Sequence, residues 1–139
     1  MKKILIFLSI LFCVTGILTL ASYFYLKTKT FQFMTGNFIE IFPQKYKAIY
    51  FNFPKGARVE GKIHLIKGEN INMYLLKKEE FENYKENKEF HPYISFYLTK
   101  DKEFLFITPA KDKYYFIFEN ASSKEIQKLK LNLYIKFSK

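Results

Sequence analysis

Residues 128–137 read KLKLNLYIKF, and every second side chain in this stretch is apolar. Successive side chains of a β-strand point to opposite faces, so the apolar ones fall together on one side of an extended chain. This side holds Leu129, Leu131, Leu133, Ile135 and Phe137. The other side carries lysine, asparagine and tyrosine. The alternation therefore predicts a strand with one buried and one exposed face.

The same period of two recurs upstream. In residues 58–65, Val59, Gly61 and Ile63 alternate with charged side chains. The turn sequence Lys-Gly-Glu-Asn at residues 67–70 then predicts that this strand pairs with residues 71–76 as a hairpin. Turn signals separate the remaining strand candidates, which are residues 37–42, 47–53, 93–98, 103–108 and 113–119.

Residues 77–86 read KKEEFENYKE and form the one helix-like insertion. Phe81 and Tyr84 are three positions apart, so both can contact a sheet from one side of a helix. About eight short strands with one short helix predict an all-β fold, an antiparallel β-sandwich spanning residues 28–139. An OB-type barrel, which has about five strands, is the competing architecture.

The N-terminal segment from Ile4 to Leu26 contains no charged side chain. At about 1.5 Å per residue such a helix reaches across a hydrocarbon core of roughly 30 Å. Aromatic residues 23–25, followed by Lys27, are typical of a membrane interface. We therefore expect residues 1–27 to be a transmembrane anchor. The alternative is a signal peptide that is cleaved after Ala21.

The flanks of this segment bear on location. Lys2 and Lys3 precede it, and a first span usually keeps its short basic end in the cytoplasm. We expect residues 28–139 on the extracytoplasmic side of the membrane. Cys13 is the single cysteine, which excludes an intrachain disulfide. The bulky Phe12 before it argues against a lipoprotein processing signal, so we expect a thiol buried in the membrane.

The chain carries 23 Lys and Arg against 13 Asp and Glu, for a net charge of +10. Aromatic residues make up 20% of it, which argues against a disordered chain. Basic grooves with aromatic rings bind single-stranded nucleic acid, so a nucleic-acid- or carbohydrate-binding module is the alternative function. The lysines are scattered, however, and Arg58 is the only arginine. A basic domain beside an anionic membrane is also attracted to lipid headgroups.

Three stretches together resemble a known family: residues 59–84, residues 108–120 and the closing strand 128–137. They are similar to the Golgi-dynamics (GOLD) β-sandwich domain and the small membrane-anchored proteins related to it. The resemblance implies a sandwich fold and a non-enzymatic binding role. The N-terminal position of the membrane segment and the lack of paired cysteines depart from the family's eukaryotic cargo receptors, so a cargo-receptor role is not carried over.

Two residues in these stretches suggest structural roles. Gly61 inside a strand suggests a bulge or a close backbone approach. Asn120 after a strand suggests a turn held by its own side chain, with a tolerance for positive φ. We expect neither residue to bind a ligand.

Residues for catalysis are sparse. His64 and His91 are the only histidines, and no nucleophile motif or phosphate-binding glycine loop accompanies them. The acidic run that includes Glu79, Glu80 and Glu82 lacks the spacing of a calcium loop and is better explained as the solvated face of the helix. We predict no catalytic residue, no cofactor and no metal site.

Some predicted strands are apolar on both faces, notably residues 114–118 (YYFIF), 49–51 and 96–98. A two-layer sandwich buries one face of each strand, so the second face is either covered, by the helix or by residues 31–42, or available to a partner. The candidate binding face consists of Tyr114, Phe116, Phe118, Tyr50 and Tyr97. We expect a single-pass membrane protein whose β-sandwich binds another protein of the envelope.

Overall fold

The computed structural model describes residues 30–137. The predicted anchor from Ile4 to Leu26 lies outside the described residues. Within the described part of the chain, no helix is long and apolar enough to cross a membrane.

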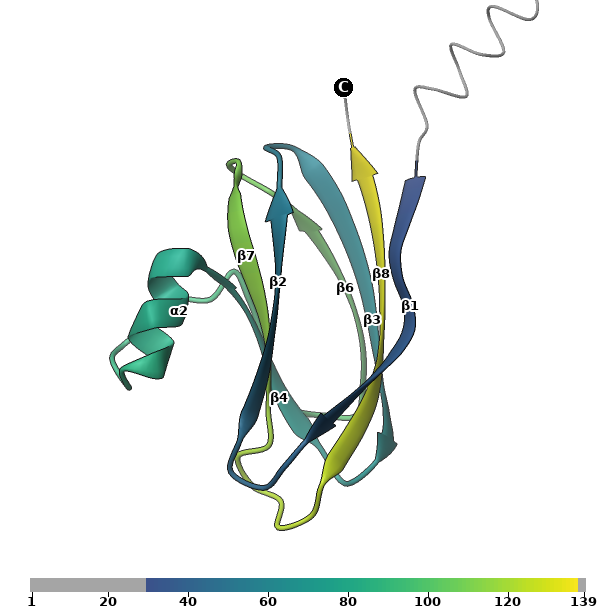
Figure 1. Ribbon diagram of the computed structural model, residues 1–139, viewed down its shortest axis with the longest axis vertical. Coiled ribbons are helices and arrows are strands. Elements are labelled where there is room, and N and C mark those ends of the chain that lie inside the picture. Colours follow the sequence, from purple (N-terminus) through teal and green to yellow (C-terminus); the bar gives the residue numbers. More distant parts are fainter. Residues whose placement is uncertain (1–29, 138–139) are drawn as a thin grey trace, which may run out of the picture.

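Eight strands and one short helix make up the described chain (Figure 1), which confirms the predicted all-β fold. The strands begin and end within a few residues of the predicted ranges, except that the first begins earlier. In chain order the elements are β1 (Thr30–Ile41), β2 (Tyr46–Phe53), β3 (Ala57–Lys67), β4 (Ile71–Lys77), α2 (Lys78–Lys85), β5 (Ile94–Thr99), β6 (Asp101–Ile107), β7 (Asp112–Glu119) and β8 (Gln127–Phe137).

The strands form two four-stranded antiparallel sheets. The first sheet has the order β1-β8-β3-β6, and the second has the order β2-β7-β4-β5. The first strand pairs with the last, β2 with β7, β3 with β6 and β4 with β5. The chain thus has the pairing of one long hairpin that is folded into two sheets. This is the arrangement of a jelly roll, one of the double-sheet solutions for antiparallel β-structure.

The predicted hairpin between residues 58–65 and 71–76 is wrong. β3 and β4 follow each other in the chain but belong to opposite sheets. Ile63 on β3 and Met73 on β4 both face the same core, so the turn between the strands must carry the chain across the sandwich. Gly68 in this turn has φ of +109°, a conformation that other residues rarely adopt.

The main core lies between the sheets and contains the apolar face that the opening alternation predicted. Leu129, Leu131, Leu133 and Ile135 of β8 are fully buried, and Phe137 is partly buried at the end of the strand. β8 lies between β1 and β3 in its sheet, so its inward face is covered along its length. Facing it are Met73 and Leu75 of β4 and Phe116 of β7.

The helix α2 lies over the outer face of the second sheet (Figure 1). A second, smaller core lies between them. Phe81 of α2 stacks on Tyr115 of β7 with ring centroids 4.2 Å apart. Leu76 and Ile117 are buried in the same cluster. The helix therefore covers the second apolar face of the central strands β7 and β4. Residues 31–42 are the other segment expected to cover this face. They lie mostly in β1, at the edge of the first sheet, and do not belong to this cluster.

Gly61 permits a close approach and does not form a bulge. It pairs in regular register with Phe104 on one side and Leu133 on the other. The ring of Phe104 occupies the place where a side chain at this position would lie.

Asn120 is fully buried and closes the turn after β7 through its side chain. Its amide donates to the carbonyl oxygens of Ile41 at 3.3 Å and Glu125 at 2.8 Å. Its Oδ1 accepts from the backbone N–H of Ser123 at 3.2 Å. Positive φ does not occur here: among the described non-glycine residues it belongs to Gln44 and Asn87.

Candidate functional site

Three of the five aromatic residues predicted to form a binding face are buried, so that part of the prediction is wrong. Tyr114, Phe116 and Phe118 are all 0% exposed and point between the sheets. β7 is a central strand, flanked by β2 and β4, and its inward face meets the first sheet. The Tyr114 hydroxyl donates to the carbonyl of Ala110 at 2.8 Å, and burial raises the pKa of this tyrosine.

Tyr50 and Tyr97 are exposed, by 56% and 65%, but the fold does not bring them together. They stand on β2 and β5, the opposite edges of the second sheet. Three strand spacings separate these edges, a width of about 14 Å. The Tyr50 ring contacts the ring of Tyr115. The ammonium group of Lys113 lies over the Tyr50 ring, 4.6 Å from its centroid.

A polar cluster connects α2 to the sheet beneath it. The Glu119 carboxylate accepts hydrogen bonds from the hydroxyl of Tyr84 at 3.0 Å, the hydroxyl of Tyr74 at 3.3 Å and the side-chain amide of Asn72 at 3.1 Å. Burial, and then the negative charge of Glu119, raise the pKa of both tyrosine hydroxyls. The hydroxyls are therefore neutral donors over the physiological range.

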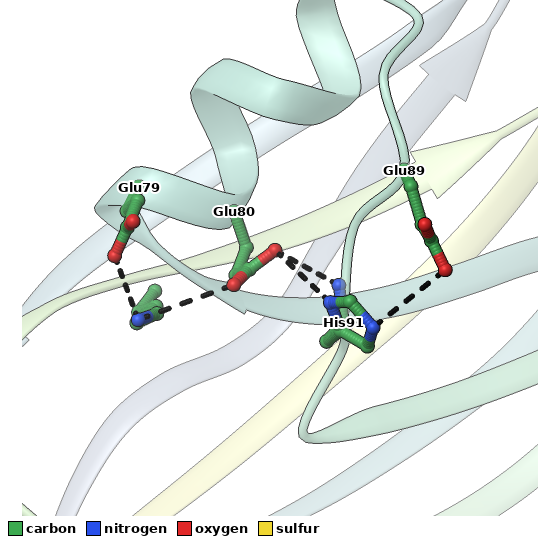
Figure 2. A network of polar contacts seen from close by, with 5 residues as sticks. Glu79, Glu80, Glu89 and His91 are labelled. Carbon is green, nitrogen blue, oxygen red and sulfur yellow. Dashed lines mark hydrogen bonds and ion pairs between the residues drawn. The ribbon is translucent and has the colours of Figure 1, made fainter.

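The two histidines lie far apart in the sequence and in different environments. The side chain of His64 on β3 contacts the carboxylate of Asp101, which lies directly opposite on the neighbouring strand β6. Both side chains are more than half exposed. His91 belongs to the network of Figure 2, where its Nδ1 lies 3.9 Å from Glu80 and its Nε2 lies 3.8 Å from Glu89.

In this network Glu80 has a structural role. Its carboxylate accepts the backbone N–H of His91 at 2.9 Å, which holds the pKa of that carboxyl below its ordinary value. Lys77 approaches both Glu79 and Glu80, at 2.8 Å and 4.0 Å. The contacts attach the loop after α2 to the start of the helix. Across residues 30–137, no group of three His, Cys, Asp or Glu side chains is placed to hold a metal ion.

β5 and β6 are joined through Lys100 and form neighbouring edges of the two sheets along one side of the sandwich, and both carry exposed apolar side chains. Leu105 and Ile107 lie on the outer face of the first sheet, whereas Tyr97 lies on the outer face of the second, against Tyr74. We call this side the β5–β6 flank and define it by Tyr93, Tyr97, Leu105 and Ile107, which are 44%, 65%, 49% and 58% exposed. The Tyr93 ring contacts Phe106 and Tyr114, so the flank continues into the main core.

A shallow hollow adjoins this flank on the outer face of the first sheet. Tyr134, Leu105 and Phe104 supply its apolar lining. Two ion pairs border it: Arg58 with Glu60 at 2.8 Å and Lys62 with Glu103 at 2.5 Å. The hydrogen bond from Arg58 lowers the pKa of Glu60, and the hydrogen bond to Glu103 raises the pKa of Lys62, so Glu60 and Lys62 are charged at neutral pH.

Sequence reasoning did not single out Leu105 and Ile107. The signal was the run FLFI at residues 104–107, which is apolar on both faces like the other aromatic runs. Nothing in the sequence separates it from those runs. β7 is central and covered on both faces, whereas β6 is at an edge.

No protein-family model matches the chain, and no curated protein matches it. The resemblance to the Golgi-dynamics domain therefore stays a prediction. Among solved structures, the chain is similar to PliG of Aeromonas hydrophila, a periplasmic inhibitor of g-type lysozyme, with a TM-score of 0.50 and 11% identity over 78% of this chain and 86% of that one. It is also similar to the Yersinia pseudotuberculosis-derived mitogen, with a TM-score of 0.49 and 10% identity over 76% and 83% of the two chains. At 11% identity the likeness to PliG shows the fold alone.

Proposed function

We propose that this protein is a single-pass, membrane-anchored, non-enzymatic binding module whose extracytoplasmic β-sandwich binds a protein partner of the envelope. The observation that carries the proposal is the β5–β6 flank. Leu105 and Ile107 expose about half of their surface on an edge strand whose other face is core. Exposed apolar side chains that adjoin a hollow are typical of interaction sites.

The anchor supports the same proposal from the sequence. Ile4 to Leu26 is uncharged and long enough to span a bilayer. The described chain begins at Thr30, which pairs with Lys136 near the end of β8. Both ends of the described sandwich thus lie at one end of the molecule (Figure 1), which leaves the flank accessible from the side.

Location is tested with the full-length chain. Replacing Lys124 by Cys in a Cys13→Ser background gives one thiol on an exposed loop. We expect the chain in the membrane fraction, with this thiol labelled by an impermeant maleimide in intact cells. Recovery of the uncleaved chain in the soluble fraction would contradict the anchor, and labelling only after lysis would contradict the orientation.

Partner binding is tested by photo-crosslinking in the same cells. A photoreactive residue in place of Ile107 reports on the flank, and one in place of Phe42 is a matched control, because both side chains are 58% exposed. Phe42 lies in the turn between β1 and β2, at the other end of the sandwich. We expect a specific adduct from position 107 only. Absence of any adduct would argue against a protein partner.

One observation favours the carbohydrate-binding alternative. Glu119 and Asn72 lie side by side on the outer face of the second sheet, in register with the exposed Tyr46. Tyr97 lies on the neighbouring edge strand β5, and its ring is edge-on to the ring of Tyr74, with centroids 5.7 Å apart. Carboxylate, amide and ring faces together suit a polyhydroxylated ring. Retention on immobilised glycans that is lost in Tyr97→Ala would favour this function. Salt-sensitive retention on single-stranded DNA would favour the nucleic-acid version instead.

A further inference from the structure

The geometry points to β6 as the acceptor of an added strand: an extended apolar segment of the partner, with acidic flanks, pairs with residues 103–107 and extends the first sheet. This inference rests on the proposed function and specifies how the partner binds. It follows from the direction of the backbone groups of β6, the distribution of its charges and the exposure of its apolar side chains.

The backbone direction follows from two hydrogen bonds at the ends of the β3–β6 ladder. The N–H of Leu65 donates to the carbonyl of Lys100 at 2.8 Å, and the N–H of Thr108 donates to the carbonyl of Ala57 at 3.0 Å. Residues 100 and 108 therefore direct their backbone groups toward β3. Groups alternate along an antiparallel ladder, and the register between these two bonds is unbroken. Hence Glu103, Leu105 and Ile107 direct their N–H and C=O groups away from β3.

No strand of the described chain lies on that side of β6, because the order of the first sheet ends there. Three outward residues offer an added strand about six backbone hydrogen bonds. Natural proteins usually protect such an edge with charged side chains, prolines or bulges. The edge of β6 has charges only in its first half, at residues 101–103.

Those charges are already engaged inside the domain. Asp101 pairs with His64, and Glu103 pairs with Lys62. The Lys102 ammonium lies over the ring of Phe96 on β5, 5.8 Å from its centroid. From Phe104 to Ile107 the edge is apolar on both faces. An incoming strand would place every second side chain on the outer face of the sheet, beside Leu105 and Ile107.

The net charge of the domain favours acidic residues at the two ends of the partner segment. Without Lys2, Lys3 and Lys27, residues 28–139 keep a net charge of +7. Acidic residues on either side of the apolar segment would be attracted to this basic domain as a whole, which speeds association.

A second copy of the chain fits this edge less well than another protein. β6 runs toward the end of the sandwich that holds Thr30, since β1, β8, β3 and β6 alternate in direction. An antiparallel pair of β6 strands would put the two Thr30 residues at opposite ends. Two chains anchored in one membrane have these ends on the same side, so they cannot form that pair.

The test uses the full-length chain, solubilised in detergent, and the protein captured by the crosslinker at position 107. Leu105→Pro removes an outward N–H and leaves the β3–β6 hydrogen bonds in place. Leu105→Ala is the matched control, because it removes the same side chain and keeps the N–H. We expect Leu105→Pro to bind the captured partner about tenfold more weakly than Leu105→Ala. Equal affinities of the two variants would overturn strand addition and leave the protein-binding function intact.

A second measurement covers the case in which Leu105→Pro fails to fold. In the wild-type chain we expect the amide hydrogens of Leu105 and Ile107 to exchange quickly when free and slowly in the complex. Those of Phe104 and Phe106 should be slow in both states, because they belong to the β3–β6 ladder. Unchanged exchange at Leu105 and Ile107 overturns the inference. Adducts from the Phe42 position alone, or an adduct that is a second copy of the chain, overturn it as well. Absence of any adduct removes both the inference and the proposed function.

Discussion

The hydroxyl of Tyr84 on α2 donates a hydrogen bond of 3.0 Å to the carboxylate of Glu119 on β7. This contact joins the only helix of the described chain to the sheet that it covers. Hydrogen bonds to charged groups contribute more than neutral ones, and here the two partners are 35 residues apart in the sequence. The cover over the second core therefore depends on a polar contact as well as on Phe81.

Replacing this tyrosine tests the contact. We expect Tyr84→Phe to lower the free energy of unfolding by about 1 kcal/mol, since it removes one donor and keeps the ring. Urea denaturation of the detergent-solubilised chain, followed by near-ultraviolet circular dichroism, measures the change. Tyr97→Phe is the control, because that side chain is 65% exposed. Equal stability of the two variants would show that the hydroxyl of Tyr84 does not hold the helix.

Stability should fall above about pH 10. Burial and the Glu119 charge raise the pKa of Tyr74 and Tyr84 above the value in the unfolded chain, which is about 10. Above that pH the unfolded chain loses these protons and the folded chain keeps them, so unfolding becomes more favourable. Urea midpoints between pH 8 and 11 measure the slope. In the Tyr74→Phe/Tyr84→Phe variant the fall should be shallower, and an unchanged slope would contradict this assignment.

Gly61→Ala should destabilise the sandwich by about 1–3 kcal/mol, the usual cost of overpacking a core. The added methyl group would overlap the ring of Phe104. A smaller side chain at position 104 should relieve the overlap. Gly61→Ala should therefore cost less in a Phe104→Leu background than alone, a coupling that a double-mutant cycle of unfolding free energies reveals. Additive effects would mean that the ring is not the obstacle.

Phe116→Ala should cost about 3–5 kcal/mol, as is usual for a buried phenylalanine, whereas Tyr50→Ala should cost less than 1 kcal/mol. Phe116 is fully buried between the sheets, and Tyr50 is 56% exposed. Thermal unfolding of the two variants distinguishes them. Similar losses at both positions would contradict the division between core and surface aromatics.

The fold class could be predicted because its signal is local. The alternation in residues 128–137 is a property of neighbouring side chains, and it holds whichever strands lie on either side. The strand boundaries and the helix after residue 77 follow from equally local signals, namely turn residues and the change in period. The sequence by itself therefore determined an all-β domain with one helical insertion, preceded by an uncharged segment long enough to span a membrane.

The tertiary structure decided which strands pair and which apolar faces are covered. β3 and β4 look like a hairpin in the sequence, yet they separate because each buries its apolar side in the same core. The run at 114–118 and the run at 104–107 are alike as sequences. The first lies on a central strand beneath α2, and the second lies on an edge. Pairing and cover depend on contacts between distant residues, such as Tyr84 with Glu119, and no local pattern encodes these contacts.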